Sequence, residues 1–200
     1  MKKLFFILFL ALCIAGGVIL SGATRPSANI VTPRTITTSQ QPTVQSTVVQ
    51  SSVSIPKSIS IPTLSVKSEI ESVGLDKEGR IDTPKDVYNT GWYALGVKPG
   101  EKGSAVIDGH LDTPEGKPSV FFKLKSLKEG DTIEIESEDN KTYTFKVYDV
   151  VDYPLETIPM GKIVEATNEK RLNLITCGGD WDKEKKLYSE RTVVYAKMIE

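Results

Sequence analysis

The chain has 200 residues, which is enough for one domain of ordinary size with appendages. Its 25 basic and 26 acidic residues nearly cancel, and no long run of either sign appears. This balance argues against nucleic acid, or a purely electrostatic contact with an anionic membrane, as the main interaction.

The N-terminal segment, residues 1–22, starts with two lysines and continues as an uncharged apolar stretch from Leu4 to Leu20. About 17 apolar residues is the lower limit for a helix that spans a bilayer. The two lysines would stay in the cytoplasm, so the rest of the chain would lie outside the cell. We expect a retained single-pass membrane anchor with the rest of the chain extracellular; the alternative is a signal peptide cleaved near Ser21–Ala23.

Residues 23–57 are rich in Ser, Thr, Val, Gln and Pro and contain no aromatic residue. No apolar face repeats along them. This composition predicts a flexible stalk between the membrane and a domain at residues 58–200.

From Ser58 onward, short runs of β-branched and aromatic residues alternate with turn residues. They predict about eight strands, at 58–64, 68–75, 90–95, 104–110, 132–137, 142–154, 171–177 and 191–200. Helical signal is sparse, with one short turn expected within 119–127 and one helix within 160–171. The class is therefore mainly β, as a sandwich or a closed barrel, and composition does not choose between them.

Three predicted strand ends carry chemically active side chains. His110, the only histidine, follows one strand, Cys177 closes another, and Arg191 opens the last. The other cysteine, Cys13, lies in the apolar N-terminal segment, so Cys177 has no partner in the exported domain. Each residue taken alone is more often structural than functional. Together, a thiol, an imidazole and a guanidinium are the parts of a nucleophilic acyl-transfer site.

The chemistry of these side chains fits that hypothesis. The thiolate fraction of a cysteine is strongly nucleophilic, and a histidine can protonate the amine that leaves a cleaved peptide bond. Arg191 could donate two hydrogen bonds to an oxyanion or to substrate carbonyl groups. Gly178 keeps the space beside the sulfur open, so that a substrate backbone can approach.

Metal and cofactor chemistry is not expected. One histidine and one available cysteine do not make a zinc site without several carboxylates. The acidic residues Glu69, Glu71, Asp76 and Glu78 lack the spacing of a calcium loop. We therefore expect neither a metal ion nor a cofactor.

The sequences around the three residues resemble the sortases, the cysteine transpeptidases of Gram-positive bacteria. The stretch NLITC, ending at Cys177, matches the sortase signature T-L-x-T-C except that Asn173 replaces the first threonine. A Gly-His pair ends a strand about 67 residues earlier, and Arg191 stands five residues before Ala196, as in the final strand of the family. The resemblance covers residues 58–200, and GHLDT…VFFKL together with TCGGDWD looks most like class F.

The resemblance implies an eight-stranded closed barrel with His110, Cys177 and Arg191 at one groove. It implies cleavage of an L-P-x-T-G-like sorting signal between threonine and glycine, through a thioester on Cys177. The partners would be surface proteins that bear sorting signals, and an amine acceptor on a peptidoglycan precursor or another protein. In the family, the histidine acts as general acid, and the arginine stabilises the oxyanion or holds the sorting signal. Thr176 corresponds to a substrate-positioning threonine, and a monomer is expected.

Some assignments stay open at this point. In some class F relatives the arginine lies nearer the cysteine, around Lys186 of this chain. Asp112 could orient the imidazole or shape the groove for substrate, or simply cap a loop. The main alternative function is a non-catalytic exported β-barrel module that binds peptide or glycan. A hydrolytic cysteine peptidase is a third possibility, although papain-like enzymes place the cysteine before the histidine.

Overall fold

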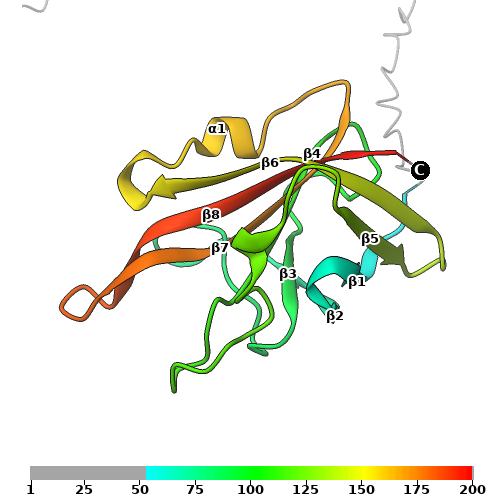
Figure 1. Ribbon diagram of the computed structural model, residues 1–200. Helices are drawn as coiled ribbons and strands as arrows, with labels where there is room; N and C mark the ends of the chain where they lie inside the picture. Colours follow the sequence, from blue (N-terminus) through cyan, green and yellow to red (C-terminus); the bar gives the residue numbers. More distant parts are fainter. Residues whose placement is uncertain (1–52, 200) are drawn as a thin grey trace, which may run out of the picture. The chain divides into compact units, whose positions relative to one another are not determined.

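The computed structural model describes residues 53–199, which form a closed barrel in the order β1-β2-β3-β4-β7-β8-β6-β5 (Figure 1). The strands are β1 Pro56–Ile61, β2 Val66–Val73, β3 Thr90–Tyr93, β4 Gly103–Gly109, β5 Thr132–Ser137, β6 Thr142–Pro154, β7 Lys170–Asp182 and β8 Leu187–Met198. The pairing of β1 with β5 closes the sheet, which confirms the barrel and excludes the sandwich.

Helices within the described part of the chain are few and short. Three are 3-10 turns and one is a single α-helical turn: η1 Pro62–Leu64, η2 Leu124–Ser126, η3 Leu155–Thr157 and α1 Met160–Ile163. The turn within 119–127 was expected, but the helix expected within 160–171 is only four residues long. Leaving α1, the chain runs as a loop to β7, and Gly103 and Ser104 of β4 donate backbone hydrogen bonds to carbonyl groups of that loop.

The predicted membrane anchor, and all but the end of the predicted stalk, lie outside the described residues. Within residues 53–199, no helix is both long and apolar enough to cross a membrane. Strand β1 begins at Pro56, two residues before the expected start of the domain.

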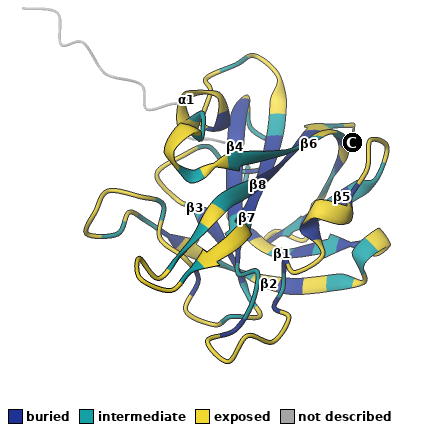
Figure 2. Ribbon diagram, turned by 60° about the vertical axis from the view of Figure 1, so that its left-hand side comes forward, coloured by how far each residue is buried: buried dark blue, intermediate teal, exposed yellow. Residues whose placement is uncertain are grey.

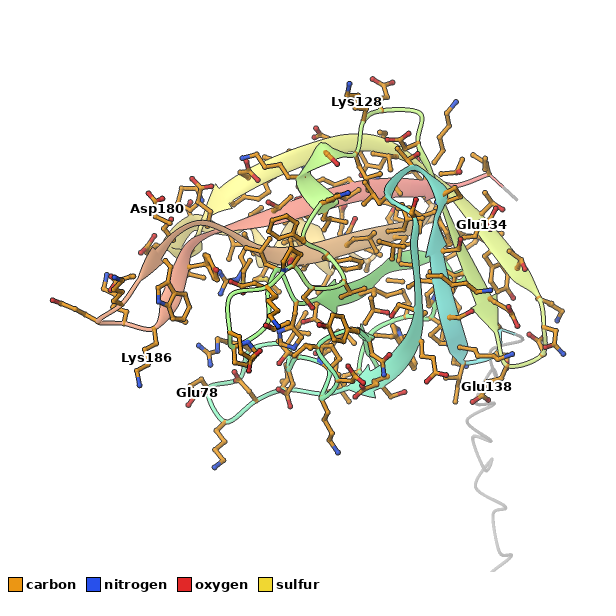
Figure 3. The ribbon with its side chains drawn as sticks, turned by 60° about the horizontal axis from the view of Figure 1, so that its bottom comes forward. Glu78, Lys128, Glu134, Glu138, Asp180 and Lys186 are labelled. Atoms are coloured by element: carbon orange, nitrogen blue, oxygen red, sulfur yellow. The ribbon has the colours of Figure 1, made fainter. Side chains whose placement is uncertain are left out.

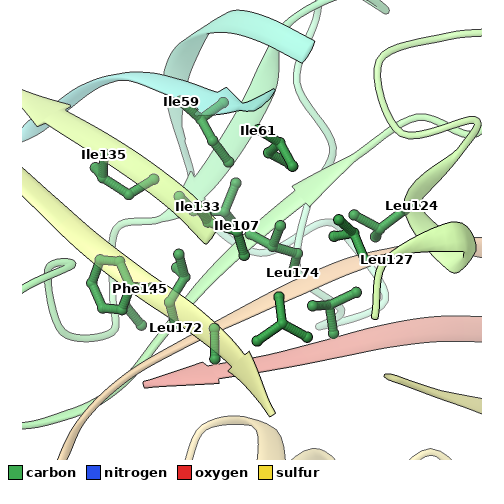
Figure 4. Packing of buried hydrophobic residues seen from close by; sticks show 14 of the residues in the cluster. Ile59, Ile61, Ile107, Leu124, Leu127, Ile133, Ile135, Phe145, Leu172 and Leu174 are labelled. Carbon is green, nitrogen blue, oxygen red and sulfur yellow. The ribbon is translucent and has the colours of Figure 1, made fainter. Parts of the chain in front are cut away.

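Period-two alternation places the apolar residues inside the barrel. In β5, Ile133 and Ile135 are fully buried, whereas the glutamates between and after them are only partly buried. These isoleucines join the interior cluster shown in Figure 4, together with Phe145, Leu172 and Leu174. Alternation is therefore the property of the sequence that encodes this part of the core.

Strands β4, β7 and β8 each contain a continuous run of five buried residues (Figure 2). Their inward side chains contribute to the interior cluster. Their outward side chains form a second cluster that includes Ile163 of α1, with Val106, Ile175, Val193 and Tyr195. The three strands read as nearly continuous apolar runs because both of their faces are covered at this end.

Candidate active site

The parallel pairing of β4 with β7 brings His110 next to Cys177. The register runs from Gly103 opposite Lys170 to Asp108 opposite Ile175, and the same offset relates residue 110 to residue 177. One hydrogen bond fixes the end of this register, because Thr176 Oγ1 donates to the carbonyl oxygen of Gly109 at 2.7 Å. Neighbouring strands lie about 4.8 Å apart, so the imidazole and the thiol start from adjacent backbone positions.

Antiparallel pairing of β7 with β8 then places Arg191 directly opposite Cys177. Two residues further into the sheet, Ile175 is opposite Val193, and both belong to the outer cluster. Side chains alternate along a strand, so Cys177 and Arg191 share that outer face. His110 directly follows β4, and alternation continued from Val106 of the same cluster assigns it to that face. The three predicted catalytic residues thus emerge from three adjacent strands on one side of the sheet.

Cys177 and Arg191 occupy strand interiors, not the strand ends that the sequence suggested. Strand β7 continues to Asp182, and β8 already begins at Leu187. A β-bulge between Gly178 and Trp181 separates the barrel part of this hairpin from the part that extends beyond it. Gly179, in the bulge, has a φ of 73°, a conformation that glycine adopts without strain. The paired glycines therefore allow the strand to bend directly after the nucleophile.

The hairpin also distinguishes Arg191 from Lys186. Lys186 is an exposed residue of the turn between β7 and β8, with a φ of 53°. Figure 3 shows it at the outer end of the hairpin. Arg191, and not Lys186, is paired with Cys177, and its action at the sulfur stays a prediction.

The guanidinium of Arg191 is tethered to the hairpin backbone. Its Nη1 donates to the carbonyl oxygens of Glu190, at 2.7 Å, and Tyr188, at 3.2 Å. Both bonds use Nη1; among the described residues, Nε and Nη2 have no assigned acceptor. A planar guanidinium held in this way is preorganised to donate to an oxyanion or to a substrate carbonyl.

Electrostatics at the thiol act in opposite directions. Cys177 is half-buried, and burial raises its pKa above the ordinary value because a thiolate loses solvation there. The guanidinium of Arg191 lowers the pKa, whereas the carboxylates of Asp112 and Asp108 raise it. The net direction is upward, so the free thiol is mostly protonated at neutral pH. An adjacent base, or the arrival of substrate, must therefore favour the thiolate.

Asp112, in the loop after His110, is hydrogen-bonded to the β7–β8 hairpin. The Tyr188 hydroxyl of β8 donates to Oδ2 of Asp112, which raises the pKa of Tyr188 to about 12. Tyr188 also packs edge-on against Trp181 across the hairpin, with ring centroids 5.0 Å apart. Asp112 therefore ties the loop after His110 to the β7–β8 hairpin, a contact that shapes the site.

The imidazole of His110 contacts backbone instead of a carboxylate. Its Nε2 lies 3.1 Å from the carbonyl oxygen of Pro84, and its own carbonyl oxygen accepts a bond from the Phe121 amide at 2.9 Å. A Cβ on the preceding Gly109 would lie 2.6 Å from the buried Phe121 ring, so a larger residue there would displace the ring. The Gly-His pair thus allows the loop after β4 to fold back onto the strand.

Thr176 and Gly178 flank the nucleophile. Thr176 is only 4% exposed, and its hydroxyl is engaged with Gly109, so it positions the site from inside the barrel. At Gly178, a Cβ would lie 3.1 Å from Oγ1 of Thr192, which favours the smallest residue. Direct contact of Thr176, Asp112 or Gly178 with substrate stays a prediction.

Sequence reasoning missed several neighbours of the site. Asp108 lies two residues before His110, on the same face, and its Oδ1 is shielded from solvent without a hydrogen-bond partner among the described residues. Pro84 contributes only a backbone carbonyl, which no residue type encodes. Tyr188 was indistinguishable from a surface tyrosine. Within residues 53–199, no group of three or more His, Cys, Asp or Glu side chains is arranged to hold a metal ion.

The comparisons with known proteins agree with this geometry. A family model for the sortase domain matches residues 59–199, so the chain belongs to the sortase family. Sortases are cysteine transpeptidases. No curated protein matches the chain.

Solved sortase structures share the fold. A lid mutant of sortase A from Corynebacterium diphtheriae is 23% identical, with a TM-score of 0.56 over 73% of this chain and 70% of that one. Sortase C-1 from Actinomyces oris is 21% identical, with a TM-score of 0.57 over 72% and 73%. A sortase D transpeptidase from Clostridium perfringens is 21% identical, with a TM-score of 0.54 over 72% and 79%. At these identities the likeness supports the barrel fold.

Proposed function

We propose that the chain is a membrane-anchored sortase that cleaves an L-P-x-T-G-like sorting signal between threonine and glycine. The resulting acyl group is carried as a thioester on Cys177 and is transferred to an amine of the cell wall or of its precursor. The observation that carries the proposal is the placement of His110, Cys177 and Arg191 on one face of three adjacent strands.

The first half-reaction forms the acyl-enzyme. The thiolate of Cys177 attacks the threonine carbonyl carbon, and the thiol proton goes to His110. Arg191 donates hydrogen bonds to the oxyanion of the tetrahedral intermediate. His110 then gives the proton to the glycine nitrogen as the carbon–nitrogen bond breaks, so a free amine leaves and the thioester remains.

The second half-reaction reverses these roles. The acceptor amine attacks the thioester carbonyl, and His110 removes a proton from the amine. Collapse of the intermediate expels the thiolate and forms a new peptide bond. A raised pKa of Cys177 stabilises the protonated thiol of the free enzyme, and it also makes the thiolate a more basic nucleophile once it forms. Water resolves the same thioester if no amine is supplied.

Several finer assignments belong to this proposal. The apolar segment at residues 1–22 supports a single-pass anchor, and residues 23–57 support a stalk that holds the domain at the outer membrane face. There the enzyme would meet exported substrates and lipid-linked acceptors. The motifs around His110 and Cys177 support class F and a Gram-positive source. The proposed enzyme acts as a monomer and uses no metal or cofactor.

The test uses the full chain in detergent micelles with peptides that contain sorting-signal variants and with a triglycine acceptor. We expect a transpeptidation product, and a thioester mass adduct that is absent from Cys177→Ala. Arg191→Lys should lower kcat/KM at least tenfold, because an ammonium lacks the planar fork. Lys186→Ala, which removes the cation that stands where some class F relatives have the arginine, should retain activity.

Two results would contradict the proposal. One is the absence of both cleavage and adduct across all signal variants. The other is peptide binding that is equal in the wild type and Cys177→Ala without any turnover, which would favour the non-catalytic binding module.

A further inference from the structure

The segment between β2 and β3 contacts the imidazole, and at the point of contact its backbone donates to a carboxylate of β2. Pro84 places its carbonyl oxygen 3.1 Å from His110 Nε2. The next two backbone amides, of Lys85 and Asp86, donate to Oε2 and Oε1 of Glu71 at 3.0 and 3.2 Å. Glu71 lies on β2 and reaches His110 only through this segment.

The connection passes through one peptide group. The carbonyl of Pro84 and the amide N–H of Lys85 belong to the same planar unit, and the described residues contain no cis peptide bond. In a trans peptide the C=O and N–H bonds point in opposite directions. Glu71 therefore accepts a hydrogen bond at one end of the peptide, while the other end faces His110.

The sheet leaves space for this arrangement at Gly91. Gly91 lies on β3, opposite Glu71 on one side and Asp108 on the other. A Cβ at this position would lie 3.2 Å from Cδ of Pro84 and 2.6 Å from Oδ1 of Asp108. Pro84 is buried here, so the segment packs against the bare backbone of β3. The position of the Pro84 carbonyl is set by close packing as well as by hydrogen bonds.

We propose that Glu71 is a positioning residue for His110 and acts through the Pro84–Lys85 peptide group. A carboxylate that accepts from the amide polarises the peptide and makes its carbonyl oxygen a stronger acceptor. A carbonyl oxygen only accepts, so Nε2 carries a proton in this contact. Nδ1 is then the nitrogen that exchanges protons with Cys177 and with the leaving amine. This role rests on the proposed function, which makes His110 the acid and base.

Glu71 has the charge state that the role requires. The Lys85 amide is the main cause that lowers its pKa, followed by the side-chain amide of Asn89, which donates to Oε1 at 3.1 Å. The carboxyl group is therefore ionised at neutral pH. Its negative charge would also stabilise the imidazolium formed when Cys177 loses its proton, as a directly bonded carboxylate does in other catalytic sites.

The single histidine makes the proposal directly measurable. Full chain labelled with ¹⁵N in histidine gives the ring-nitrogen signals of His110 alone, and these report the tautomer without any turnover. The variants are Glu71→Ala, which removes the carboxylate, and Glu71→Gln, which keeps an acceptor oxygen but no charge. Glu69→Gln is the matched control, since Glu69 is an exposed residue two positions earlier on β2.

We expect the wild type and Glu69→Gln to hold the neutral ring as the Nε2–H tautomer, and Glu71→Ala to give a mixture of tautomers. In thioester formation, kcat should fall about tenfold in Glu71→Ala and about threefold in Glu71→Gln, with KM within about twofold, because Glu71 does not reach the substrate. If Glu71→Ala disturbs folding, Glu71→Gln alone carries the test.

An unchanged tautomer together with an unchanged kcat in both Glu71 variants would overturn the inference. So would a loss that appears only in KM. An inactive wild type would overturn the proposed function instead, while the tautomer of His110 would still decide whether Glu71 positions the ring.

Discussion

The hydrogen bond from Thr176 to Gly109 is the contact whose loss should separate the thiol from the imidazole. Thr176→Val keeps the shape of the side chain but removes the hydroxyl that joins β7 to β4 immediately before Cys177 and His110. A buried hydrogen bond contributes about 1 kcal/mol, and leaving its acceptor unsatisfied costs about 1–3 kcal/mol. We therefore expect the free energy of unfolding to fall by about 1–3 kcal/mol.

Catalysis should change more than stability does. Without the bond, the end of the parallel register is free to shift, and proton transfer between Cys177 and His110 is sensitive to displacements of about 1 Å. We expect kcat for thioester formation to fall at least tenfold in Thr176→Val with little change in KM. Urea unfolding of the full chain gives the stability, and single-turnover kinetics followed by mass spectrometry gives the rate.

Thr90→Val is the matched control for this experiment. Thr90 is also fully buried, and its hydroxyl donates to a neighbouring backbone carbonyl, that of Glu69, at 3.1 Å. That bond joins β3 to β2, so its loss should cost similar stability and leave the rate nearly unchanged. Equal rate losses in Thr176→Val and Thr90→Val would refute the reasoning, because they would show a general effect of destabilisation.

Three further predictions test the electrostatics and the backbone of the site. Asp112→Asn removes a carboxylate that raises the pKa of Cys177, so alkylation by iodoacetamide at neutral pH should become about twofold faster; a slower reaction would contradict this. Gly179→Ala should lower the free energy of unfolding in urea by about 1–2 kcal/mol because of its positive φ, whereas Gly161→Ala, with open space around it, should not. Burial raises the pKa of Asp108 well above 3.8 in the folded protein. As the pH rises past 3.8, Asp108 therefore ionises in the unfolded chain before it does in the folded one. The free energy of unfolding then falls by about 1.4 kcal/mol for each unit by which the two pKa values differ. Asp108→Asn abolishes this loss, so the stability of the variant relative to the wild type should increase from pH 4 to pH 7. Parallel curves of unfolding free energy against pH would contradict the prediction.

The strands were predictable because local patterns encode them. Ile133 and Ile135 alternate with glutamates, and the structure buries them in the barrel. The outward residues of β4 and β7 were harder to predict, because Ile163 of α1 packs against them and both faces of these strands are apolar. Barrel closure depends on the pairing of β1 with β5, which are more than 70 residues apart, and only the resemblance to sortases predicted it.

Strand ends were harder to locate than strands. Gly178 and Gly179 looked like the end of β7, since glycine weakens a strand and favours turns. In the structure they form part of a bulge, and pairing resumes beyond it at Trp181 opposite Tyr188. A bulge and a turn have the same local signal, and only pairing with the partner strand decides between them. The surroundings of His110 were equally hidden, because the Pro84 carbonyl that contacts it belongs to the backbone.

The bulge lies beyond Cys177, where it does not disturb the pairing of Cys177 with Arg191. A shift of one residue in a strand exchanges its two faces, so an extra residue before Cys177 would point the thiol into the barrel. The extra residue lies after Gly178, so the register of Cys177 with Arg191 is kept and only the outer part of the hairpin is re-aimed. Moving the bulge, by deleting Gly179 and inserting a glycine before Thr176, should therefore abolish thioester formation even in a chain that still folds. Activity that survives this exchange would show that the register of β7 does not set the position of the nucleophile.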